Sequence, residues 1–75
     1  MNKAVERIII TRGCAFLRRH MEIKNSQIKR LREAEARITD FVIASSINGK
    51  QPEETVDNMY MIIQDIYGIE RNLTT

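Results

Sequence analysis

The sequence predicts an all-α protein, and three of its features support this fold class. The 75-residue chain is rich in residues that favour helices and contains only three glycines and one proline. Apolar residues recur at spacings of three and four, as they do on one face of an amphipathic helix. A strong turn signal lies at 45–51, where Asn48 and Gly49 tolerate positive φ. We therefore expect helices on both sides of this turn.

The first predicted element is one long helix over about 3–45. Steps of three and four residues from Ile10 reach eleven positions, eight of them apolar, and this register passes through 24–26 without a slip. The alternative is a break at Gly13 or at Lys24-Asn25-Ser26, which would give two shorter helices. The unbroken register favours the continuous helix, because a turn between independent helices has no reason to preserve it.

The second predicted element is a shorter helix at about 53–67, which follows a turn at 46–51. Pro52 suits a first helical position, because its φ is fixed and its missing N–H is not needed there. The two glutamates that follow place negative charge at the positive end of the helix dipole. Gly68 is placed to end the helix in the left-handed conformation.

We expect a single domain, 1–75, in which the shorter helix returns antiparallel to the long helix as a hairpin and 68–75 form a tail. A helix of this length reaches about 22 Å and covers only about 30–45 of the long helix. Large apolar patches seldom stay exposed, so we expect hairpins to assemble through their long helices into a dimer or larger bundle. The expected oligomer interface contains Ile8, Ile10, Cys14, Leu17, Met21, Ile28 and Leu31.

Charge is unevenly distributed along the chain. The net charge is +2, but residues 1–37 carry +6 and residues 38–75 carry −4. This asymmetry indicates either an anionic partner for the first half or pairing between the halves, within or between chains. A solvated helix face is the plain alternative. The candidate binding residues of the basic face are Arg12, Arg18, Arg19, Lys29, Arg30 and Arg32.

Catalytic and metal-binding patterns are missing from the sequence. Cys14 and His20 are the only residues of their types, so one chain cannot assemble a transition-metal site from them. No nucleophile has a nearby base, and no glycine-rich phosphate loop is present. We expect no enzyme, no metal and no cofactor. The lone cysteine and charged first twenty residues favour the cytoplasm, with no signal peptide and no membrane partner.

The leading functional hypothesis is a small non-enzymatic regulator or adaptor that self-associates and binds a protein partner through a helical face. Its size and lack of chemistry are typical of modulators of host proteins, such as those of phages and mobile elements. The alternative is a nucleic-acid-binding transcriptional regulator that uses the basic face. A variant of it has that face hold a small anionic ligand between subunits.

Residues 20–31 carry a weak resemblance to a helix-turn-helix, which would imply DNA binding. In that arrangement Ser26 would cap a recognition helix that presents Gln27, Lys29 and Arg30. The proposed turn lacks glycine, and the unbroken register argues against a break.

Overall fold

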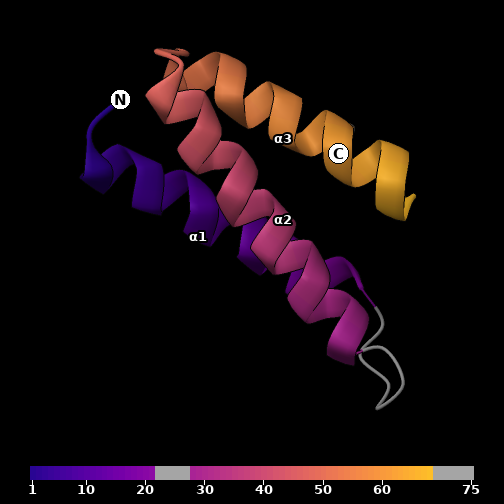
Figure 1. Ribbon diagram of the computed structural model, residues 1–75. Helices are drawn as coiled ribbons and strands as arrows, with labels where there is room; N and C mark the ends of the chain where they lie inside the picture. The colour runs from indigo at the N-terminus through magenta and orange to yellow at the C-terminus, as the bar shows by residue number, and fades with distance from the viewer. Residues whose placement is uncertain (22–27, 69–75) are drawn as a thin grey trace.

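The computed structural model describes residues 1–21 and 28–68. Over these two ranges the chain forms three α-helices and no strand: α1 spans Lys3–His20, α2 spans Ile28–Ile47 and α3 spans Pro52–Tyr67. Each helix contacts the other two. Figure 1 shows the three helices and the turn that joins α2 to α3. The predicted all-α fold class is confirmed.

The helix α1 begins and ends within the N-terminal third of the chain. The Asn2 side chain caps its start by accepting a hydrogen bond from the Val5 N–H at 2.8 Å. It ends at His20, because Met21 adopts an extended conformation with ψ of 127°. The prediction of one helix over 3–45 is therefore wrong. Residues 22–27, which contain the alternative break at 24–26 and the turn of the helix-turn-helix interpretation, lie outside the described residues.

The helices α1 and α2 pack side by side with opposite chain directions. Near one end the Ser46 hydroxyl donates to the Met1 carbonyl, and toward the other the Arg18 guanidinium pairs with Glu35 at 3.0 Å. The unbroken apolar register has a different cause from the one expected. Two amphipathic helices that fold onto each other each need an apolar face, so periodicity alone does not require a continuous helix.

A tight turn connects α2 to α3. The Gly49 N–H donates to the Ser46 carbonyl, and the Lys50 N–H donates to the Ser45 carbonyl. Gly49 has a φ of +75°. This is the Schellman arrangement, in which a left-handed glycine closes a helix. The C-terminal end of α3 is also closed by a left-handed glycine: Gly68 has a φ of +65°, and its N–H donates to the Gln64 carbonyl. Pro52 occupies the first turn of α3 as expected, so α3 begins one residue before the predicted helix at 53–67.

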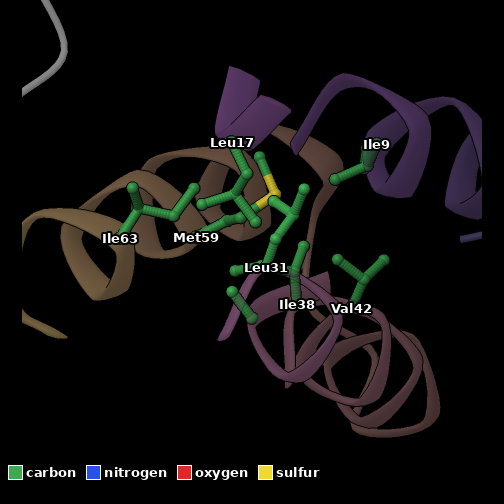
Figure 2. Packing of buried hydrophobic residues seen from close by; sticks show 8 residues of the cluster. Ile9, Leu17, Leu31, Ile38, Val42, Met59 and Ile63 are labelled. Atoms are coloured by element: carbon green, nitrogen blue, oxygen red, sulfur yellow. The ribbon is translucent and has the colours of Figure 1, made fainter. Parts of the chain in front are cut away.

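The hydrophobic core lies where the three helices meet (Figure 2). Leu17, Ile38, Val42, Met59 and Ile63 are fully buried, so α1, α2 and α3 all contribute to it. Among residues 1–21 and 28–68, the buried apolar side chains are Ile9, Leu17, Leu31, Ala34, Ile38, Val42, Met59 and Ile63.

The residues predicted to form an oligomer interface have several environments. Leu17 and Leu31 lie in the core of the single chain, because α1 folds back on α2 and the two faces cover each other. The half-buried members of the set, Ile10, Cys14 and Met21, lie at the core's edge or beside it. By contrast, Ile8 and Ile28 are 59% and 38% exposed.

Candidate protein-binding surfaces

The described residues contain neither a metal site nor a membrane span. Within 1–21 and 28–68, no three His, Cys, Asp or Glu side chains lie close enough together to hold a metal ion. None of the three helices is both long and apolar enough to cross a membrane. The candidate functional features of this part of the chain are its surface hollows and charged side chains.

A hollow of about 220 Å³ lies at the edge between α1 and α3. Five residues line this α1–α3 hollow: Arg12, Ala15, Phe16, Arg19 and Tyr60. The two arginines are seven residues apart on α1, so they lie on the same helix face two turns from each other, with Phe16 between them. Both arginines are exposed.

Aromatic rings from two helices meet beside the arginines. The Phe16 and Tyr60 rings contact edge to face, with centroids 5.0 Å apart and planes at 83°. The His20 ring, one turn later on α1, also lies near Phe16, with the two ring centroids 4.3 Å apart. Edge-to-face packing fixes the ring positions and gives the hollow an apolar wall beside two cationic groups.

The chemistry of the α1–α3 hollow suits a carboxylate that neighbours an apolar group. A guanidinium offers several N–H donors in a plane and pairs with carboxylates through two parallel hydrogen bonds. Phe16 and Tyr60 supply ring surface for the apolar neighbour of such a group. The hollow therefore fits an acidic segment of a protein better than an uncharged one.

A larger groove separates α2 from α3. It consists of two adjoining hollows of about 650 and 450 Å³ that share Glu33, Arg37 and Ile66. Figure 1 shows the α2 and α3 ribbons moving apart with distance from the turn that joins them. The described residues that line this α2–α3 groove are Arg30, Glu33, Ala36, Arg37, Asp40, Phe41, Ile62, Ile66 and Tyr67.

The six predicted basic residues are all exposed, but they do not share one face. Arg12 and Arg19 line the α1–α3 hollow. Arg18 pairs with Glu35 of the neighbouring α2, and Arg30 lies over the Tyr67 ring of α3, 5.7 Å from its centroid.

The prediction of a single basic face depended on a continuous helix. Because α1 and α2 are separate helices that run in opposite directions, these arginines are divided among the three edges of the bundle. The remaining members, Lys29 and Arg32, are exposed on α2.

Cys14 lies beside the Arg18–Glu35 ion pair and is half-buried. Burial raises the pKa of its thiol above the ordinary value of 9.0, and the Glu35 carboxylate raises it further. Arg18 opposes both effects by favouring the thiolate. This environment keeps the thiol protonated at neutral pH and favours a packing role for Cys14 over a reactive one.

The contact between Phe16 and Tyr60 and the apolar lining of the α2–α3 groove were not predicted from the sequence. Both aromatic residues are visible as apolar positions in helical registers, yet nothing in the sequence indicates that rings 44 residues apart meet. The contact between the two rings can be predicted only if the opposite directions of α1 and α2 are known. Comparison with protein-family models, with curated proteins and with solved structures gave no match.

Proposed function

We propose that this chain is a small non-enzymatic regulatory or adaptor protein of the cytoplasm that self-associates and binds an acidic segment of a protein partner. The observation that carries the proposal is the α1–α3 hollow, where Arg12 and Arg19 flank the Phe16–Tyr60 ring pair. Paired guanidinium groups give charge recognition, and the rings supply the apolar anchor that interfaces need near their centre.

A helical partner segment fits this arrangement well. Arg12 and Arg19 are two helical turns apart, about 10.5 Å along the axis at 1.5 Å per residue. Two acidic side chains at a spacing of seven on a facing helix would match them, with an apolar residue between for the rings. Arginine and aromatic residues are both enriched at protein interfaces, which supports a protein partner over solvent alone.

Binding of nucleic acid is the second candidate, and the exposure of all six predicted basic residues favours it. The distribution of acidic residues opposes it. The helix α3, which follows the tight turn, carries four carboxylates and no lysine or arginine over 52–67. Such a helix would repel phosphates, so duplex contacts would be limited to the separated basic side chains of α1 and α2. A small anionic ligand held between subunits remains a variant of this candidate.

The test uses a designed helical peptide as the probe, with two glutamates seven residues apart and a leucine midway between them. We expect NMR titration of the labelled chain to shift the amide signals of Arg12, Phe16, Arg19 and Tyr60. The double variant Arg12→Glu/Arg19→Glu should weaken binding at least about tenfold, since both favourable charge pairs become repulsive. Arg7→Glu is the matched control, because Arg7 is exposed on α1 but does not line the hollow.

A parallel titration with a 20-base-pair duplex separates the two candidates. Under the leading proposal, binding to DNA is negligible at about 150 mM salt, where non-specific affinities fall to about 10⁻⁴–10⁻⁶ M. Nanomolar binding that discriminates between duplex sequences would put the nucleic-acid regulator first. Peptide binding that the double variant leaves unchanged would contradict the assignment of the partner to this hollow.

A further inference from the structure

Four charged residues form one stripe along α2. Arg30, Glu33, Arg37 and Asp40 follow one another at spacings of three, four and three, so they lie on one side of the helix. All four are exposed, and all four line the α2–α3 groove. Their charges alternate along the helix as positive, negative, positive and negative. We call these residues the α2 charge stripe.

The α2 charge stripe is complementary to itself when it is reversed. Arg30 and Asp40 are each five residues from position 35, and Glu33 and Arg37 are each two residues from it. If two α2 helices pack antiparallel around a twofold axis at position 35, Arg30 faces Asp40 and Glu33 faces Arg37. Twofold symmetry repeats each pair, because an isologous interface uses the same patch on both copies.

We propose that a second copy of this chain occupies the α2–α3 groove, with its α2 antiparallel to the first and centred at position 35. Four intermolecular ion pairs then form along the α2 charge stripe. A parallel arrangement would place like charges opposite one another, so the stripe also selects the direction of the partner helix.

Apolar groups beside the stripe supply the rest of the interface. Phe41 and Ile62 are half-buried in the groove, and Ile66 is 43% exposed. The incoming α2 would cover these side chains on both copies, because the symmetry places each α2 in the groove of the other. Ala36 lies beside the axis, and its small side chain allows the two helix backbones to approach closely.

This inference specifies the self-association that is part of the proposed function, but it does not depend on the α1–α3 hollow. The two surfaces use different residues, because the α2–α3 groove contains none of the residues that line the hollow. If the peptide does not bind in the hollow, the dimer interface is unaffected. If the chain does not dimerise, peptide binding in the hollow is unaffected.

Reversing the charges at Glu33 and Arg37, the two central positions of the α2 charge stripe, tests the interface. Sedimentation equilibrium of the wild-type chain at low salt should show a reversible monomer–dimer equilibrium. The variants Glu33→Arg and Arg37→Glu should each weaken dimerisation at least about tenfold, since each places like charges opposite one another. The double variant Glu33→Arg/Arg37→Glu restores opposite charges at both pairs and should dimerise like the wild type.

Mixing the two single variants gives the sharpest result. A copy with Glu33→Arg presents two arginines at these positions and a copy with Arg37→Glu presents two glutamates, so a heterodimer between them has only favourable pairs. We expect the mixture to dimerise although each variant alone stays largely monomeric. An effect confined to one chain, such as the i,i+4 spacing of residues 33 and 37, cannot produce this recovery.

The control variant is Arg32→Glu, because Arg32 is exposed on α2 but does not line the groove. Circular dichroism of each variant should show wild-type helix content. The proposal is overturned if the wild-type chain stays monomeric up to about 1 mM, where an interface is worth about 4.1 kcal/mol. It is also overturned if the mixed single variants dimerise no better than either alone.

Discussion

Gly13 of α1 lies directly against Met59 of α3. A β-carbon built on Gly13 would be 2.6 Å from the Met59 Sδ and 2.9 Å from the Ile38 Cγ2. Met59 and Ile38 are fully buried, so either side chain would have to shift within the core to admit this atom. The glycine that sequence analysis considered as a helix break is therefore a point where α1 approaches both other helices closely.

We expect Gly13→Ala to destabilise the fold. Alanine favours a helix interior by about 1 kcal/mol over glycine, which would stabilise α1 in isolation. The added methyl group overpacks the core, and such insertions cost about 1–3 kcal/mol. The net result should be a lower unfolding free energy in urea denaturation. An increase in stability would show that Met59 and Ile38 can rearrange at little cost.

A double variant identifies the contact responsible. Met59→Ala removes the side chain that the new methyl group would meet, although it leaves a cavity of its own. The loss caused by Gly13→Ala should therefore be smaller in the Met59→Ala background than in the wild type. Equal losses in the two backgrounds would mean that Met59 is not the obstacle.

Cys14 should react slowly with alkylating reagents at neutral pH. Its raised pKa leaves little thiolate, which is the reactive form. Glu35→Gln removes the negative charge that raises the pKa of the thiol, so alkylation should become faster. Arg18→Gln removes the opposing positive charge and should make alkylation slower. Mass spectrometry of iodoacetamide labelling at several pH values measures all three rates.

The same pKa shift predicts how stability depends on pH. The folded state holds the Cys14 proton more tightly than the unfolded state, because burial and Glu35 disfavour the thiolate. The contribution of the thiol is therefore complete below the ordinary pKa of 9.0 and is lost as pH rises above it. Cys14→Ala should reduce this alkaline loss when urea denaturation is compared between pH 8 and pH 10.

The sequence predicted the second half of the chain well, because its signals are local. Pro52 and the left-handed glycines Gly49 and Gly68 act within a few residues of their own positions, and the structure places α3 one residue from its expected start. The chain reversal after His20 was missed for the opposite reason. Apolar periodicity predicts which residues are buried. It does not indicate whether the helix that packs against them belongs to the same chain or to another one.

The candidate surfaces depend on this reversal, so the sequence predicted their members better than their grouping. Arg12 and Arg19 were expected on one face and do line one hollow, whereas Arg30 belongs to a different edge. The Phe16–Tyr60 contact joins α1 to α3 and depends on tertiary packing. The charged residues can be identified from the sequence, but the apolar groups that lie beside them depend on the tertiary fold.

Thr55 provides a test of the start of α3. Its side chain is 1% exposed, and its hydroxyl donates a hydrogen bond to the Gln51 carbonyl at 3.0 Å. Thr55→Val keeps the shape of the side chain but removes this donor, which should lower stability by about 1 kcal/mol. Thr55→Ser keeps the donor and loses one methyl group, so it separates hydrogen bonding from packing in thermal unfolding. Equal stability of the valine variant and the wild type would show that the hydrogen bond contributes nothing.

The last prediction distinguishes a core within one chain from a core shared between chains. Leu17 is fully buried among residues of its own chain, so Leu17→Ala should lower the unfolding free energy by about 2–5 kcal/mol. Ile8 is 59% exposed on the same helix, and Ile8→Ala should change stability by about 0.5 kcal/mol or less. Urea denaturation at two protein concentrations about 50-fold apart supplies the deciding observation. If Leu17 packs within the chain, its loss is the same at both concentrations. If long helices instead assembled through Leu17, as the sequence alone suggested, the loss would grow with protein concentration, because only the associated form would bury that side chain.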